Sequence, residues 1–217
     1  MSQVSLDCRI TVDTILGIHR LLAEDTRLSR FAGQVREVQN WIGGSAYNPC
    51  AAVYVPPPPS EVPRLLEDLA AFCNDDSLPA IAQAAVAHAQ FETIHPFVDG
   101  NGRVGRALIH AVLRRRGIAP WVVPPLSLIL ATLTEDYIAG LTSYRYEGDP
   151  SSPDALRGLN GWIAFYAGCC SRSVADADRF EECVAAIQRG WRESIGMVRH
   201  NSTTDPWVRR STTSRSQ

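Results

Sequence analysis

A thirteen-residue stretch, IHPFVDGNGRVGR at residues 94–106, most constrains how this chain can fold. Its Asp-Gly and Asn-Gly pairs are typical of tight β-hairpin turns, in which both central residues need positive φ. A hairpin also requires alternating strands on both sides, and the downstream side keeps a period of 3.6 residues through Val104, Leu108 and Val112. Because the Ala-rich upstream side is helical too, the stretch predicts a loop between two helices, with its glycines at the start of the second.

Glycines at a helix start favour a phosphate-binding site. The first backbone N–H groups of a helix have no partner within it, and the helix dipole is positive at that end. Glycine also lets a ligand approach the backbone without a Cβ in the way. The Gly-x-Gly at residues 100–102 therefore predicts an anion cradle. Arg103 and Arg106 lie three residues apart on one helix face, from which both can donate to phosphate oxygens.

Asp99 and His95 add a candidate metal ligand and a candidate general base to this pattern. A carboxylate ahead of the cradle would repel bare phosphates, but it can hold a divalent cation that bridges them, as Mg²⁺ does with one or two carboxylates. The ordinary pKa of histidine, about 6.5, suits His95 to accept a proton near neutral pH. Each feature alone is common. Their conjunction within twelve residues predicts nucleotide-dependent transfer to a nucleophile that must lose a proton.

The rest of the sequence predicts a mainly α-helical chain with one β excursion. Residues 33–59 combine Gly33, Gly43, Gly44 and the run Pro56–Pro59 with short β-prone pieces, which is typical of a hairpin-like flap. The polar tail over residues 200–217 predicts a mobile end. Apolar spacing indicates helices over about residues 11–25, from Ser60 past Phe72, and over 78–93, 102–116, 126–132, 134–145, 154–173 and 174–195.

Composition bounds the class of protein. The net charge is −2, so no global basic field recruits nucleic acid or a membrane surface. No apolar run approaches the roughly 18 residues that span a bilayer, and the first residues do not form a secretory signal. The six cysteines show no metal-binding spacing, which favours reduced thiols in the cytoplasm.

Residues 95–106, HPFVDGNGRVGR, resemble the full signature of the Fic family, within the Fic/Doc (Fido) fold. The resemblance runs from about residue 11 to 175 and includes GQVREVQNWIGG, YVPPPP, LLEDLAAFCN, AHAQFETIHPF, DYIAGLTSYR and LNGWIAFY. It implies a Fic/Doc-like helical bundle with a short β-hairpin flap. The expected organisation is a helical lead-in over 1–30, a core over 31–175 with the flap at about 43–58 and the motif at 95–106, and a C-terminal helix and tail over 176–217.

The resemblance also implies a protein adenylyltransferase, which transfers AMP from ATP to a Ser, Thr or Tyr hydroxyl of a target protein and releases pyrophosphate. His95 would be the general base, and Asp99 would hold Mg²⁺ against the α- and β-phosphates. The backbone of Gly100, Asn101 and Gly102 would form the anion hole, with Arg103 and Arg106 on the outer phosphates and Arg106 also catalytic. The flap would align an extended segment of the protein substrate by strand addition.

For several residues the sequence allows two interpretations, one functional and one structural. Tyr137 or Tyr144 would touch the adenine or pack in the core. His88 is expected to pack within its helix, although His88, His95 and Asp99 could be imagined as a metal triad. The tryptophans at 41, 121, 162 and 191 are expected to be core or edge-packing aromatics. Arg114–Arg116 are expected to form a solvated helix end that favours the helix dipole.

The sequence is compatible with several modes of regulating the activity and with more than one phosphate-containing donor. Many relatives carry an inhibitory helix with a Ser/Thr-x-x-x-Glu-Gly or -Asn pattern, and neither Glu24 nor Glu193 fits it. An antitoxin-like partner acting in trans, a truncated chain and the absence of inhibition are the three alternatives. Removal of AMP is disfavoured, since relatives that do it use that glutamate. The alternative functions are transfer from another nucleotide or phosphodiester donor, a non-catalytic binding module and a DNA-binding regulator.

Overall fold

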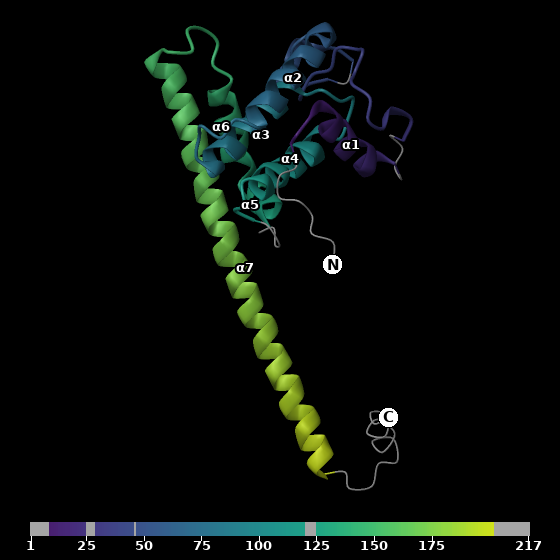
Figure 1. The fold of residues 1–217 in the computed structure, drawn as a ribbon, viewed down its shortest axis with the longest axis vertical. Helices are drawn as coiled ribbons and strands as arrows, with labels where there is room; N and C mark the ends of the chain where they lie inside the picture. Colours follow the sequence, from purple (N-terminus) through teal and green to yellow (C-terminus); the bar gives the residue numbers. More distant parts are fainter. Residues whose placement is uncertain (1–8, 25–28, 46, 120–124, 202–217) are drawn as a thin grey trace. The chain divides into compact units, whose positions relative to one another are not determined.

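The computed structural model describes residues 9–24, 29–45, 47–119 and 125–201, with side chains described as far as residue 195. Its α-helices run in the order shown in Figure 1: α1 (Val12–Ala23), α2 (Val62–Cys73), α3 (Ala80–Ile94), α4 (Asn101–Arg115), α5 (Leu126–Thr132), α6 (Thr134–Tyr144) and α7 (Pro153–Asn201). The mainly helical class is confirmed. Trp121 and the tail beyond residue 201 lie outside the described residues.

The chain divides into two compact units between Ser173 and Val174, and α7 runs through the division. The expectation of separate helices over 154–173 and 174–195 is therefore wrong. The physical reason is the absence of a helix breaker, because neither glycine nor proline occurs between Gly168 and Gly190. The Ser173 hydroxyl donates to the Cys170 carbonyl at 2.9 Å, so this polar side chain is satisfied within the helix.

Helix α3 is the centre of the first unit. It is apolar on almost every side, with Ala84, Ala85, Ala87 and Phe91 fully buried, and it packs against α2 and α4. The first part of α7 closes the core through Trp162, whose indole Nε1 donates to the Ala85 carbonyl at 2.7 Å. The two helices that flank the motif are therefore held by the most buried part of this unit.

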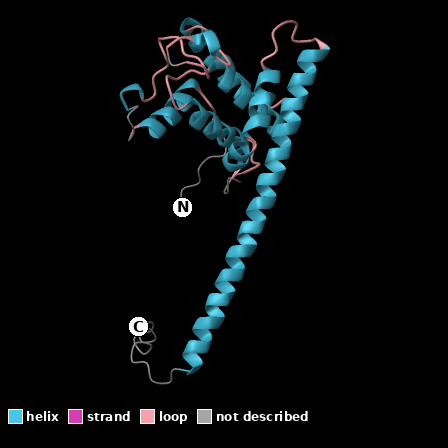
Figure 2. Cartoon of the chain, turned by 180° about the vertical axis from the view of Figure 1, so that it is seen from behind, coloured by secondary structure: helices cyan, strands magenta, loops and turns pink. Residues whose placement is uncertain are grey.

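The predicted β-hairpin flap does not form as two strands, and no strand occurs in the described part of the chain (Figure 2). One antiparallel bridge joins Ile42 to Tyr54, with the Ile42 N–H donating to the Tyr54 carbonyl at 2.9 Å. Gly43 and Gly44 turn the chain at positive φ directly after Ile42. The prolines from Pro56 onward lack the N–H groups that a longer ladder needs, so the pairing stops after one bridge.

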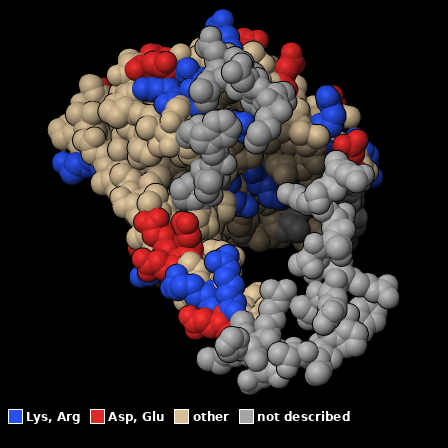
Figure 3. Space-filling model, turned by 60° about the horizontal axis from the view of Figure 1, so that its bottom comes forward, with Lys and Arg blue, Asp and Glu red and all other residues tan. Residues whose placement is uncertain are grey.

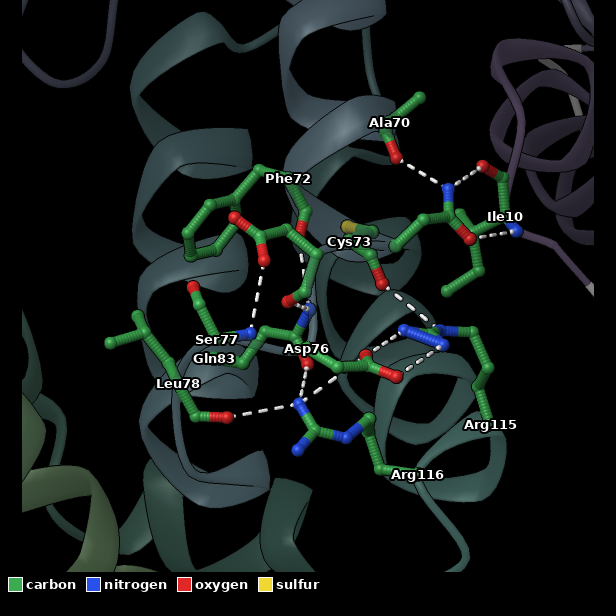
Figure 4. A network of polar contacts seen from close by, with 12 residues as sticks. Ile10, Ala70, Phe72, Cys73, Asp76, Ser77, Leu78, Gln83, Arg115 and Arg116 are labelled. Atoms are coloured by element: carbon green, nitrogen blue, oxygen red, sulfur yellow. Dashed lines mark hydrogen bonds and ion pairs between the residues drawn. The ribbon is translucent and has the colours of Figure 1, made fainter.

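The end of α4 is anchored at Arg115 and Arg116, which corrects the expectation of a solvated helix end for these two residues, whereas Arg114 is exposed as expected. The Arg115 guanidinium pairs with the Asp76 carboxylate, and its Nε donates to the Cys73 carbonyl at 3.1 Å. The Arg116 Nη1 lies 3.5 Å from the same carboxylate and donates to the Leu78 carbonyl at 3.0 Å (Figure 4). These contacts fix the C-terminal end of α4 to the connection between α2 and α3.

The surface carries no single basic field in the view of Figure 3, where acidic and basic groups are interspersed over a mostly uncharged face. This agrees with the small net charge. Within the described residues, none of the helices is long and apolar enough to cross a membrane.

Candidate active site

The motif forms a loop between α3 and α4, as its sequence predicts. His95 ends α3 in the left-handed conformation, at φ 48° and ψ 60°, and its N–H donates to the Phe91 carbonyl at 2.9 Å. Gly100 begins α4 at φ 83°, a conformation that favours glycine. A non-glycine residue with positive φ costs about 1–3 kcal/mol and persists only where its surroundings hold it there, and here that residue is the predicted general base.

The side chain of Asn101 fixes the loop internally. It is almost fully buried, accepts from the Phe97 N–H at 2.9 Å and donates to the Phe97 carbonyl at 2.8 Å. Asn40, from the segment before the flap, donates to the same carbonyl at 3.1 Å. Because the Asn101 side chain is used in this way, what it can offer to an anion is its backbone N–H.

His19 of α1 packs against the motif loop and fixes its backbone, a role that sequence reasoning missed. Its ring stacks on the buried Phe97 ring, with centroids 3.9 Å apart and planes 9° from parallel. The Gly33 N–H donates to Nδ1 at 3.0 Å, so Nε2 carries the proton and donates to the Asp99 carbonyl at 3.2 Å. His19 therefore fixes the backbone on which the Asp99 carboxylate is mounted.

Arg36 connects the flap to the catalytic loop and was also missed. Arg36 is only 2% exposed, and its guanidinium donates to backbone carbonyls on both sides. Nε donates to His95 at 2.9 Å, while Nη1 donates to Val38 at 3.3 Å and Nη2 to Pro57 at 2.5 Å. The Arg36 backbone N–H donates to the Pro96 carbonyl at 2.9 Å. One buried cation thus holds both sides of the site together.

The predicted anion cradle corresponds to the first turn of α4. The N–H groups of Asn101 and Gly102 have no partner within the helix at this position. A Cβ on Gly102 would lie 3.1 Å from Nη1 of Arg106, so this arginine reaches back over the cradle. Arg103 instead donates from Nη1 to the Leu22 carbonyl at 3.1 Å. The Asp99 carboxylate is exposed beside the cradle and accepts from the Gly100 N–H at 2.5 Å.

His95 and Glu92 form a buried pair at the C-terminal end of α3. Nδ1 of His95 lies 3.8 Å from Oε2 of Glu92, and both side chains are largely shielded from solvent. Burial lowers the pKa of His95 to about 4 and raises the pKa of Glu92 to about 7. The imidazole is therefore neutral at neutral pH and able to accept a proton.

Tyr137 and His88 lie on the core side of this pair. The Tyr137 hydroxyl and Nε2 of His88 are hydrogen-bonded at 3.0 Å, and both rings pack near Trp162. Burial lowers the pKa of His88 to about 4. His88 thus packs within the core, and the described residues contain no group of three His, Cys, Asp or Glu side chains that could hold a metal ion. The proposed contact of Tyr137 with adenine stays a prediction.

Tyr54 and Arg145 tie the flap to the end of α3. The Tyr54 hydroxyl donates to the Thr93 carbonyl at 3.0 Å, and the Arg145 guanidinium lies over the Tyr54 ring, 3.9 Å from its centroid. Arg145 also donates to the Glu92 carbonyl at 3.0 Å. Neither residue belongs to the contiguous motif, so only the fold could bring them to it.

The described fold is a helical domain in which the loop between α3 and α4 carries His95 and leads into the helix start that is the predicted anion cradle. Residues 9–113, which contain the whole motif, match the Fic/DOC family. The chain therefore belongs to the Fic/DOC family.

Among curated proteins, the chain is 32% identical over 118 residues to "Protein adenylyltransferase fic-1" of Caenorhabditis elegans, a match that covers 53% of this chain and 21% of that protein. It is 33% identical over 118 residues to "Protein adenylyltransferase Fic" of Drosophila grimshawi, covering 53% of this chain and 22% of that protein. The match thus spans about a fifth of the length of these relatives.

Solved structures show the same fold. A Fic family protein from Desulfovibrio desulfuricans G20 superposes with a TM-score of 0.63 at 24% identity, covering 80% of this chain and 49% of that one. A Fic domain containing signaling protein from Bacteroides thetaiotaomicron VPI-5482 gives a TM-score of 0.60 at 23% identity, covering 78% of this chain and 62% of that one.

Proposed function

We propose that this chain is a protein adenylyltransferase, which transfers AMP from ATP to a hydroxyl group of a target protein and releases pyrophosphate. The observation that carries the proposal is the His95 imidazole, which burial keeps neutral, in the loop that leads into the first turn of α4, where Arg106 reaches back towards Gly102. A base that is already unprotonated at neutral pH can take the hydroxyl proton as the oxygen attacks phosphorus. A positioned base of this kind contributes roughly 10²–10⁴ in rate.

The cradle decides which phosphorus reacts. The N–H groups at the start of α4 and the guanidinium of Arg106 would hold the outer phosphates, with Arg103 joining them once it leaves the Leu22 carbonyl. The α-phosphorus would then face His95. The negative charge that develops on the leaving pyrophosphate would be stabilised by the N–H groups of α4 and by Arg106, which need no reorganisation during the reaction.

The residues present fit a Mg²⁺ ion. Asp99 offers an exposed carboxylate next to the cradle, and Mg²⁺ bound to nucleotides commonly takes one or two protein carboxylates, phosphate oxygens and water. When bound, the ion would neutralise phosphate charge. The contribution of this chain is to fix Asp99, through the hydrogen bonds of its carbonyl to His19 and of its carboxylate to the Gly100 N–H.

The flap would present the target hydroxyl to His95. Three apolar side chains on it are exposed, namely Tyr47, Val53 and Val55, which is the kind of surface that an extended peptide segment covers. Its single bridge leaves most of the flap backbone free to add a strand. Arg36 would keep the flap, and with it the docked segment, in register with the base, since it donates to the carbonyl of Pro57 in the flap and to that of His95.

The test is to incubate the chain with Mg²⁺, a protein extract as acceptor, and ATP labelled on either the α- or the γ-phosphate, with His95→Ala in parallel. Protein-bound α-label without γ-label, lost in His95→Ala, is the expected result. Bound γ-label would replace the proposal with phosphate transfer. Measurable ATP binding with no protein-bound label would favour a non-catalytic module, and the same assay with other labelled nucleotides tests an alternative donor.

A further inference from the structure

Glu92 places a buried carboxyl group next to the proposed base. Its side chain is only 8% exposed and that of His95 is 18% exposed, and Oε2 of Glu92 lies 3.8 Å from Nδ1 of His95. Burying an ionisable carboxyl costs free energy unless the group is paired. The position of this carboxyl, inside the first unit and against the imidazole, therefore calls for a chemical explanation.

The two oxygens of the Glu92 carboxyl face different elements. Oε2 faces His95 at the end of α3, whereas Oε1 lies against α4, where a Cβ on Gly105 would overlap it. Oε1 of Glu92 and Nδ1 of His95 are both buried, and neither has a hydrogen-bond partner of normal geometry among the described residues. Buried polar atoms of this kind are few in folded proteins, and a role in catalysis is one recognised reason for them.

This arrangement decides which nitrogen of His95 meets an acceptor hydroxyl. Because Nδ1 faces Glu92, Nε2 is the nitrogen left for the hydroxyl, and Nε2 can accept a proton only when Nδ1 carries the ring hydrogen. An oxygen acceptor beside Nδ1 favours that tautomer. A separation of 3.8 Å is too long for a hydrogen bond, but catalytic hydrogen bonds are often long in a free enzyme and shorten in the complex with substrate.

The backbone carbonyl of Glu92 is a second acceptor near the imidazole. It raises the pKa of His95, although burial lowers this pKa by more. The same carbonyl already accepts from Nη2 of Arg145 at 3.0 Å. A replacement of the side chain alone leaves this carbonyl in place, so the contribution of the carboxyl can be measured separately.

We propose that Glu92 is a positioning residue for AMP transfer, which holds His95 in the tautomer with a hydrogen on Nδ1 and stabilises the imidazolium that forms during the step. The inference rests on the proposed adenylyltransferase function. In this step the O–H bond of the acceptor breaks, its proton moves to Nε2, and the oxygen forms a bond to the α-phosphorus. The bond from the α-phosphorus to the bridging oxygen breaks, and its electron pair leaves with pyrophosphate. His95 gains a positive charge beside a carboxyl that can carry a negative one.

The charged groups around the pair set the pH range in which the carboxyl can do this. Burial raises the pKa of Glu92 to about 7, although Arg145 and Arg106 lower it. The carboxyl therefore ionises in the neutral range. The other charged or titratable groups that face the pair are Arg36 and Asp99, which act on His95, and His88 and Tyr137 on the core side. Because the carboxylate form stabilises the imidazolium, the rate of transfer should rise with pH through about 7.

The first test is the rate of AMP transfer from α-labelled ATP to a protein extract, measured in single turnovers between about pH 6 and about pH 8. Glu92→Gln has the same shape and no charge. At the upper end of this range it should be slower than wild type by at least about tenfold, with little change in ATP binding, and should lose the rise with pH. Glu92→Asp keeps the charge and should recover part of the rate. Glu61→Gln is the matched control at a half-exposed position and should follow the wild type.

The second test needs no transfer activity. Nitrogen-15 NMR of the full-length chain, with the His95 signals assigned by comparison with His95→Gln, reports the tautomer of the imidazole. The wild type should carry the hydrogen on Nδ1 above about pH 7, whereas Glu92→Gln should show a mixture of tautomers. Thermal unfolding checks that each variant is folded.

Two kinds of failure are distinguishable. A wild-type chain that transfers no AMP would overturn the proposed function, and the tautomers would then decide by themselves whether Glu92 positions His95. A hydrogen on Nε2 in the wild type, the same tautomer in wild type and Glu92→Gln, or a folded Glu92→Gln that transfers AMP at the wild-type rate would each overturn the role of Glu92.

Discussion

The guanidinium of Arg36 donates a 2.9 Å hydrogen bond from Nε to the backbone carbonyl of His95. The same side chain donates to Val38 and Pro57 on the flap side, and it is buried among these carbonyls. The position of the proposed base is therefore set by a residue nearly sixty positions earlier in the chain. The hydrogen bonds of Arg36 therefore connect the flap directly to the catalytic loop.

Replacement of Arg36 by methionine should therefore impair the site more than its distance in sequence suggests. Several buried carbonyls would lose their donor, at a cost of about 1–3 kcal/mol for each group left unsatisfied. We expect a marked drop in the unfolding temperature and a fall in kcat that exceeds any change in KM for ATP. Thermal unfolding and steady-state kinetics measure both. Arg64→Met is the matched control, since Arg64 is exposed and forms a surface ion pair with Glu61 three residues earlier.

The two motif arginines should differ in their effects. Arg106 already reaches over Gly102, whereas Arg103 bonds to the Leu22 carbonyl. We expect Arg106→Lys to reduce kcat/KM for ATP by about 10²-fold or more, because a bidentate fork is lost, and Arg103→Lys to reduce it less. Equal losses, measured with ATP as the varied substrate, would contradict this ranking.

Gly105 is a position where only glycine fits. A Cβ there would overlap the Glu92 carboxyl and lie 3.1 Å from the His88 ring. Gly105→Ala should therefore lower the free energy of unfolding by about 1–3 kcal/mol, as overpacking of a tight core does. Gly161→Ala on α7 is the matched control, because its Cβ would meet nothing within 4 Å and should stabilise the helix by up to about 1 kcal/mol. Denaturant unfolding of the two variants gives both values.

The Glu92 carboxyl predicts a pH dependence of stability. Its folded-state pKa is raised to about 7 from 4.5, so the folded chain keeps a proton that the unfolded chain releases between these values. The stabilisation from this group is present below about pH 4.5 and is lost as the pH rises through about 7. Glu92→Gln keeps the group neutral throughout.

The unfolding temperature of Glu92→Gln, relative to wild type, should therefore rise by a few degrees between about pH 5 and about pH 8, given that about 1 kcal/mol corresponds to 2–4 °C in a domain of this size. Glu61→Gln, at a half-exposed position, should show no such trend. A difference that is constant over this range would mean that the carboxyl ionises freely in the folded state.

The contiguous part of the site could be predicted from sequence because its chemistry is local. The helix periodicity on both sides of residues 94–106 defined the loop, and the glycines between them defined the helix start. His19, Arg36 and Tyr54 could not be found in this way, since each reaches the motif from another element and through backbone carbonyls or ring stacking. Several residue types can donate to a backbone carbonyl or stack on a ring. A single sequence therefore does not reveal which residues make these contacts.

The errors of sequence reasoning have physical causes as well. The flap has β-prone residues, but its prolines and positive-φ glycines stop the ladder after the pair Ile42–Tyr54. The helix over residues 153–201 was divided in the prediction where no breaker residue exists. Trp191 was expected in a core or at its edge because of its residue type, yet it is 66% exposed, and its helical spacing with Phe180 and Ile187 places all three on one exposed face of α7.

The most direct test of the central claim is intact-mass spectrometry of protein acceptors after incubation with the chain, Mg²⁺ and unlabelled ATP. The account predicts an added mass of one AMP group on a hydroxyl side chain, with an equal amount of pyrophosphate released, and neither product with His95→Ala. An added phosphate alone would contradict it, as would AMP transfer that persists at the wild-type rate in His95→Ala.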